Sequence, residues 1–242
     1  MVLTGVTLLL ALVLVFSPSI PQDLAYHQFA DGRTIFGFPN FWNVLSNLPF
    51  VFIGLWAIWR LNASEGGLNK FTVLFLLGFF LTGFGSAYYH WVPSNQTLVW
   101  DRLPMTIAFM PFFALMLSLH IGKKVGDMLL WPLVATGIFS VIYWNYTEGL
   151  GQGDLRLYAA VQFIPIALVP LMVLLFPAKD YKVKYLWYLV AAYVSAKIFE
   201  QLDDEIYQFF PLGGHAIKHV AASLSGIAFV YFILSIKTNK EK

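Results

Sequence analysis

Residues 71–91 read FTVLFLLGFFLTGFGSAYYHW, an apolar run that ends in polar and aromatic side chains. A helix that crosses a bilayer needs about 20 mostly apolar residues, and this run has that length. The run therefore indicates a membrane-spanning helix. Its polar residues Ser86 and His90 stand four positions apart near its end, so they share one helix face close to one membrane surface.

The rest of the chain has the same character. The 242 residues are 59% hydrophobic and 12% charged, whereas a soluble globular chain is about 45–50% apolar and about 25% charged. This composition excludes an ordinary soluble enzyme, a coiled coil and a disordered chain. The net charge of +2 gives no reason to expect a nucleic-acid partner. Cysteine is absent, so any metal must be held by His, Asp or Glu.

Apolar stretches of spanning length recur along the whole chain. We predict an all-α integral membrane protein, a seven-transmembrane-helix bundle over residues 41–242 with an extra N-terminal transmembrane helix in residues 1–20. A cleaved signal peptide is the alternative for residues 1–20, and residues 21–40 form an extracytoplasmic segment. The predicted spans are 2–19, 41–60, 71–91, 102–121, 127–145, 157–177, 184–202 and 213–236.

The basic residues between these spans predict the orientation of the chain. One set of loops holds Arg60, Lys70, Lys123, Lys124, Lys179, Lys182, Lys184, Lys237, Lys240 and Lys242. The opposite loops hold only Arg33, Arg102 and Arg156. Loops rich in Lys and Arg stay in the cytoplasm. We therefore expect a cytoplasmic C-terminus and an extracytoplasmic segment 21–40.

Ionisable residues near the extracytoplasmic ends of three predicted spans form one candidate site. Ser86 and His90 end one span, Asp101 precedes the next, and His215 and His219 begin the last. Because His215 and His219 are four residues apart on one helix, both imidazoles can reach one ion. Such residues at membrane depth are costly and are functional candidates by default. Asp101 taken alone is also a natural residue for a helix N-terminus.

The chemistry of this set favours a metal-dependent hydrolase. Three His ligands with an open position are typical of catalytic zinc, although they admit other transition metals. We expect His90, His215 and His219 to hold the metal. A nearby carboxylate, Asp101, can take a proton from water, and the Ser86 hydroxyl can orient that water or donate to a developing oxyanion. These roles describe hydrolysis of an ester or an amide.

The pattern resembles the alkaline ceramidase family of the CREST superfamily of seven-helix membrane hydrolases and receptors. The resemblance rests on Ser86-x-x-x-His90, on Asp101 eleven residues later, and on His215-x-x-x-His219, and residues 41–47 (FWNVLSN) resemble the start of that family's first core helix. It covers roughly residues 40–236. It implies a zinc ion held by the three His, Asp101 as acid/base and Ser86 as its helper. The implied reaction cleaves ceramide-like N-acyl lipids, taken from the bilayer, into a fatty acid and a sphingoid-type amine.

Two departures from the family pattern affect the expected ligands and substrate. Eukaryotic members carry a calcium site in an acidic stretch before the first core helix, whereas here Asn40 stands at an expected acidic position, so we expect no calcium. The added N-terminal segment marks a divergent, bacterial-type branch whose substrate can differ. The alternatives are an acyl-ester (phospholipase-like) hydrolase of the same superfamily and a seven-helix zinc-containing receptor or sensor.

Other polar residues receive structural interpretations. Lys197 and Glu200, three residues apart, predict an ion pair. Lys218 is offset from the His pair and is expected to point outward. The loop that contains Glu148, Asp154 and Arg156 is interpreted as solvated, with a lid or headgroup contact as the alternative. His27 lies outside the motif and has no assigned role.

Overall fold

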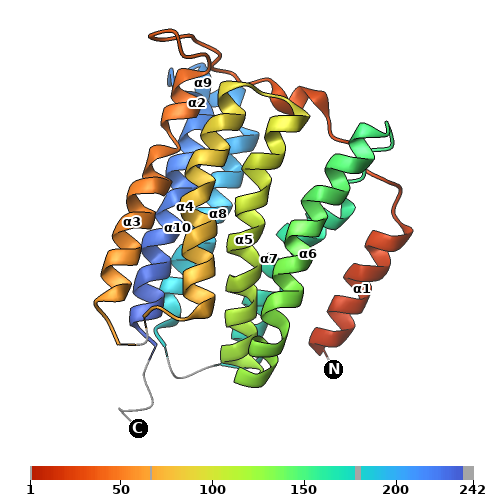
Figure 1. The fold of residues 1–242 in the computed structure, drawn as a ribbon, viewed down its shortest axis with the longest axis vertical. Helices are drawn as coiled ribbons and strands as arrows, with labels where there is room; N and C mark the ends of the chain where they lie inside the picture. The colour runs from red at the N-terminus through yellow and green to blue at the C-terminus, as the bar shows by residue number, and fades with distance from the viewer. Residues whose placement is uncertain (1, 66, 178–180, 237–242) are drawn as a thin grey trace.

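The computed structural model describes residues 2–65, 67–177 and 181–236, and these ranges contain helices and loops with no strand. Figure 1 shows the long helices side by side in one bundle, with α1 packed against α7 at one flank. The prediction of an all-α membrane bundle is confirmed. The elements are α1 (Val2–Phe16), the 3-10 helix η1 (Leu24–His27), α2 (Phe41–Leu45), α3 (Leu48–Asn62), α4 (Lys70–Trp91), α5 (Asn95–His120), α6 (Lys123–Gly149), α7 (Arg156–Leu175), α8 (Val183–Gln201), α9 (Asp203–Tyr207) and α10 (Gly213–Leu234).

All eight predicted spans are helical, and six described segments are long and apolar enough to cross a membrane. These are Phe41–Asn62, Lys70–Trp91, Asn95–His120, Lys123–Gly149, Arg156–Leu175 and Gly213–Leu234. The first comprises α2 and α3, with a break at Ser46 and Asn47. The other two predicted spans differ from these six. Helix α8 contains the charged residues Lys197 and Glu200, and α1 is shorter, at about 22 Å for its 15 residues.

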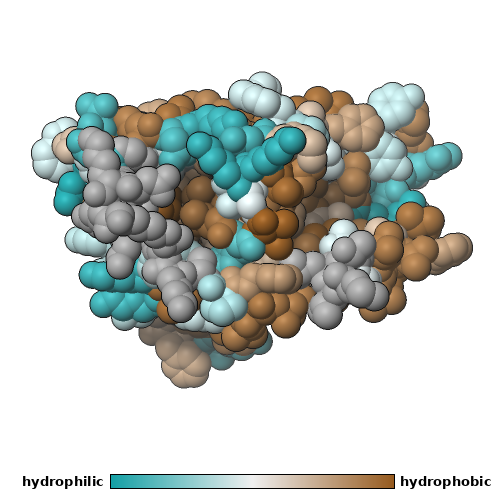
Figure 2. Space-filling model, turned by 90° about the horizontal axis from the view of Figure 1, so that it is seen from below, coloured by the Kyte–Doolittle hydropathy of each residue, from teal (hydrophilic) through white to brown (hydrophobic). Residues whose placement is uncertain are grey.

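The two ends of the bundle differ in chemistry. The end where α4 stops at Trp91 and α10 begins at Gly213 is called the site end below. Loops at the opposite end, which Figure 2 views, carry exposed basic side chains beside hydrophobic residues. Arg60, Lys70, Lys123, Lys124, Lys182 and Lys184 belong to this basic set, and Lys179, Lys237, Lys240 and Lys242 lie outside the described residues. Which end faces the cytoplasm stays a prediction of the charge pattern.

Helix α5 begins earlier than the sequence suggested. Ser94 accepts a hydrogen bond from the Thr97 backbone N–H, and the Thr97 hydroxyl accepts one from the Ser94 N–H, a reciprocal cap that starts the helix at Asn95. The interpretation of Asp101 as a helix cap is therefore wrong. Asp101 lies in the second turn of α5, inside the bundle's site end.

Close packing of α4 on α5 depends on glycine. A Cβ atom at Gly85 would collide with the carbonyl oxygen of Trp100, and one at Gly78 would collide with the backbone at Pro104 and Ala108. Glycine removes these clashes and lets the two backbones touch. Since Gly85 precedes Ser86 and Trp100 precedes Asp101, the same contact brings these two polar residues together.

The loop between α6 and α7 is held by a largely buried ion pair and by contacts with the end of α1, so its interpretation as a solvated loop is wrong. Asp154 is 4% exposed and pairs with Arg156, with Nη2 and Oδ2 2.8 Å apart. Arg156 Nη1 also donates to the backbone oxygens of Leu14 (3.3 Å) and Ser17 (2.5 Å) at the end of α1. One guanidinium therefore joins this loop to the end of the N-terminal helix.

The Asp154–Arg156 ion pair makes the stability of the fold depend on pH. Hydrogen bonds from Arg156 lower the pKa of the Asp154 carboxyl to about 2, whereas an unfolded Asp titrates near about 3.9. The resulting stabilisation is complete above about pH 4 and is lost as the pH falls toward about 2. We expect Asp154→Asn to lower the melting temperature at neutral pH, with a difference from the parent that shrinks as the pH falls below about 4. The exposed Asp204→Asn is the matched control, and a deficit independent of pH would contradict the assignment.

Candidate metal centre

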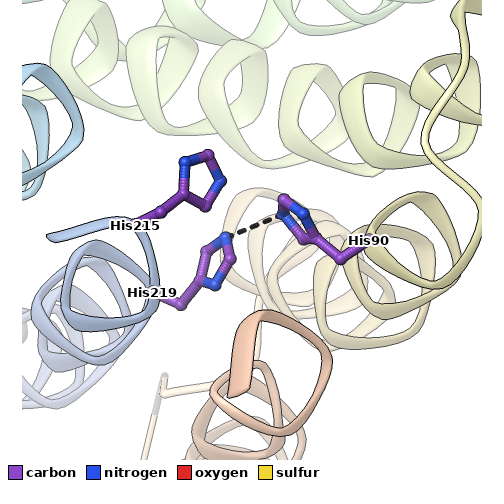
Figure 3. A group of neighbouring side chains, drawn as sticks. All are labelled: His90, His215 and His219. Atoms are coloured by element: carbon purple, nitrogen blue, oxygen red, sulfur yellow. Dashed lines mark hydrogen bonds between the residues drawn. The ribbon is translucent and has the colours of Figure 1, made fainter. Parts of the chain in front are cut away.

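Three buried histidines meet at the site end of the bundle. Figure 3 shows His215 and His219 on α10 facing His90, which projects from α4. One candidate ligand atom from each of the three lies within 4.8 Å of the others. His90 Nε2 and His219 Nε2 are 3.1 Å apart, close to the about 3.3 Å expected for two nitrogens on one tetrahedral zinc with bonds of about 2.05 Å.

The unsatisfied atoms of this cluster fit a bound cation. His90, His215 and His219 are 1%, 5% and 5% exposed, and His90 Nδ1 and His215 Nε2 have no hydrogen-bond partner. A buried polar atom without a partner costs about 1–3 kcal/mol. A metal ion would give the orphaned His215 nitrogen a partner in this pocket, so the donor set suits a metal.

Ser46 holds His219 in the protonation state that a metal ligand needs. The Ser46 hydroxyl donates to the Asn43 carbonyl at 3.1 Å, so its oxygen accepts from His219 Nδ1–H at 2.8 Å. With the proton on Nδ1, the Nε2 lone pair faces His90 and is free to bind a cation. The sequence had singled out the segment 41–47 but assigned Ser46 no role, because residues 173 positions apart form the contact.

Removing the Ser46 hydroxyl tests this role. We expect Ser46→Ala to weaken metal binding about 10–100-fold, as the loss of a partner that orients a ligand does. Ser46→Thr keeps a hydroxyl at the same position and should restore most of the affinity. A competition titration with a metal chelator measures both. Equal affinity in the alanine variant and the parent would show that His219 needs no such partner.

Ser86 and Asp101 lie beside the histidines at a shared cavity. Ser86 is 2% exposed, and its hydroxyl lies beside the Asp101 carboxyl group. Both side chains line a cavity of about 330 Å³, and His219 lines it too. The structure thus brings all five predicted residues to one region, with His90 and His215 behind His219.

The cavity is amphipathic. Its apolar wall is built by side chains of α3, α4 and α5, namely Phe50, Phe75, Phe79, Ala108 and Phe109. Its polar wall carries Tyr26, Arg102, Lys197, Glu200 and Lys218. A ligand with a long hydrocarbon chain and a polar head matches both walls.

The segment before α2 covers the histidines. The Phe29 ring centroid lies 4.7 Å from that of His90 and 4.5 Å from that of His215. His27, which had no assigned role, bonds the Tyr89 hydroxyl at 3.0 Å and Asn95 Oδ1 at 2.9 Å. His27 therefore fastens this segment to α4 and α5, and Phe29 shields the cluster from one side.

The charged residues of α8 and α10 form one partly buried network. Lys197 and Glu200 pair at 2.6 Å, which confirms the predicted ion pair. The prediction that Lys218 points outward is wrong, because Lys218 Nζ is 2.5 Å from Glu200 Oε1 and its side chain is 14% exposed. Packing of α10 against α8 turns this lysine toward the carboxylate.

The segment examined for a calcium site is held by protein contacts. The Asp31 carboxylate accepts two hydrogen bonds from Arg33, at 2.7 and 3.0 Å. The Asn40 amide donates to the backbone oxygen of His90 at 2.9 Å. The expectation that this segment binds no calcium stays a prediction of the sequence.

The fold and the site define a multi-pass membrane protein with a buried three-histidine cluster at an amphipathic cavity. The sequence model of the family described as Ceramidase matches residues 38–200, and the chain belongs to the ceramidase family. Membership supports a ceramidase-type lipid amidohydrolase. The matched range includes Ser86, His90 and Asp101 and ends before His215 and His219. A comparison with curated proteins finds no match.

Proposed function

We propose that this protein is a metal-dependent amidohydrolase that cleaves ceramide-like N-acyl lipids into a fatty acid and a sphingoid-type amine. One observation supports it above the others: Ser86, Asp101 and His219 line the same cavity, and apolar side chains such as Phe75 and Phe79 line it as well. The lipid chains would lie against these apolar side chains while the amide sits at the polar side chains.

The three histidines are the proposed ligands of zinc. When bound, zinc supplies Lewis-acid activation of water near neutral pH. His219 is oriented for this by Ser46, and Phe29 limits access of bulk water to His90 and His215. A drier site strengthens the electrostatic interactions within it.

Asp101 and Ser86 are the proposed proton-handling residues. Asp101 would accept a proton from the attacking water as the oxygen bonds to the amide carbon. It would return that proton to the nitrogen as the C–N bond breaks, so that the amine leaves neutral. The Ser86 hydroxyl, which lies beside Asp101, would donate to the developing oxyanion and stabilise it.

The test is fatty acid release by the purified, metal-loaded protein, with ceramides and phospholipids offered in parallel. Release from ceramide that stops on metal removal is the expected result. Release from phospholipid alone would keep the catalytic groups and replace the amide by an ester. No release from either, with metal bound, would contradict the enzyme proposal and favour a receptor or sensor.

A further inference from the structure

The polar wall of the cavity carries more positive than negative side chains. Three cations, Arg102, Lys197 and Lys218, line it against two carboxylates, Asp101 and Glu200. The carboxylate of Glu148 is close in the fold but lies behind Gln22. Gln22 separates it from Arg102, donating from its backbone N–H to Glu148 at 2.5 Å and accepting from Arg102 at 2.6 Å.

Both oxygens of Glu200 accept hydrogen bonds, and its single negative charge cannot neutralise two lysines. Its Oε1 accepts from Lys218 at 2.5 Å and from the Tyr26 hydroxyl at 3.2 Å, and its Oε2 accepts from Lys197 at 2.6 Å. An ammonium group has three N–H donors, so each lysine keeps donors beyond its bond to Glu200. Asp101 forms no ion pair within the described ranges and lies beside the Ser86 hydroxyl.

Arg102 is an incompletely paired cation in the same wall. It is 6% exposed, and its guanidinium carbon lies 4.2 Å from the ring centroid of Trp144 and 4.7 Å from that of Tyr158. Nη2 donates to Gln22, whereas Nη1 is buried with no hydrogen-bond partner. Burying a charge is costly unless it is paired and hydrogen-bonded. A negatively charged group bound at this wall would therefore lower the cost of burying Arg102.

We propose that this wall, formed by Arg102, Lys197, Lys218 and Glu200, is an anion subsite for the headgroup of the lipid substrate. The occupant is an amphiphile that carries an oxyanion, a phosphate or a carboxylate, next to its acyl chain. Its negative charge balances the net positive charge of the polar wall, and its hydrocarbon chain lies on the apolar wall. The identity of the substrate as an N-acyl lipid rests on the function proposed above, whereas the charge preference rests on this wall.

Binding of simple amphiphiles to the purified full chain in a nonionic detergent tests the subsite. The probes are dodecyl phosphate, dodecanoate and uncharged dodecanol. We expect an anion to bind more tightly than the alcohol. Lys218→Gln and Lys197→Gln should each weaken anion binding at least about tenfold, the loss of one charge-assisted hydrogen bond, with alcohol binding unchanged. Glu200→Gln should strengthen anion binding, since it raises the surplus charge.

The control is Lys124→Gln, which removes the same charge from an exposed position at the opposite end of the bundle. It should leave all affinities unchanged. If the two cavity variants weaken the alcohol as much as the anions, the network is merely structural and the proposal is overturned. If Glu200→Gln fails to fold, comparing the anion affinities of Lys218→Gln and Lys197→Gln with that of Lys124→Gln still tests the proposal. A preference for dodecyl phosphate or for dodecanoate distinguishes the two sources of the oxyanion.

Hydrolysis assays separate this inference from the proposed function. N-acyl lipids with a phosphate, a carboxylate or an uncharged headgroup are offered to the parent and to Lys218→Gln. Turnover of none of them, with the anion-binding pattern intact, would reject the amidase and leave the subsite. Equal turnover of the three in both proteins, with no anion preference in binding, would overturn the subsite and leave the amidase.

Discussion

His219→Ala is expected to abolish metal binding and hydrolysis together. The substitution removes the ligand atom nearest to His90, at 3.1 Å, and the one histidine of the three that lines the cavity. Two remaining nitrogens do not make the three-histidine site that catalytic zinc uses. Loss of several kcal/mol of Lewis-acid stabilisation corresponds to at least about a thousandfold lower turnover.

Metal content by elemental analysis and fatty acid release are measured on the same preparation. His120→Ala is the matched control, because His120 lies at the opposite end of the bundle and bonds Phe176 and Tyr181. It should keep the metal and the activity. Full turnover by a His219→Ala protein that holds no metal would rule out the metal mechanism. Metal retained at the parent's level would remove His219 from the ligand set.

Asp101→Asn is expected to keep the metal and lose most of the turnover. The amide has the shape of the carboxylate and can still contact Ser86, but it cannot take a proton from water. Removal of a general acid/base costs about 10²–10⁴-fold in rate. The metal should remain because the group of candidate metal ligands consists of His90, His215 and His219 and does not include Asp101.

The measurements are again metal content and turnover, now with the pH dependence of the rate. The parent should show a limb of the pH–rate profile that the variant lacks. Asp127→Asn, which breaks the Lys70–Asp127 ion pair, changes a carboxylate at the opposite end and should leave both readouts unaffected. Loss of the metal in Asp101→Asn would instead make Asp101 a ligand or a determinant of the fold.

Much of the histidine cluster could be predicted because its determinants are local. His215 and His219 share a helix face by their spacing, and His90 ends an apolar run of fixed length. Charge asymmetry then predicted that both helix ends lie at one membrane surface. Packing of the bundle was needed only to close the last few ångströms between α4 and α10.

Other contacts at the site depend on segments that are distant in the chain. Ser46 meets His219 because α2 packs against α10, and Phe29 reaches the cluster because the segment before α2 crosses the site end. Lys218 carried a misleading local signal, since a lysine near a helix end commonly extends to water. Its partner Glu200 belongs to another helix, so no pattern within residues 213–236 could reveal the pair.

The sequence by itself determined the membrane environment, the helical class and the residues able to bind a metal. These follow from composition, run length and i,i+4 spacing, which act within one helix. Tertiary structure alone decided how His219 is oriented, which carboxylate faces Ser86, and that two lysines and an arginine line one cavity. These depend on which helix faces meet, and that choice is made by packing, such as the contact of Gly85 with Trp100, over the whole bundle.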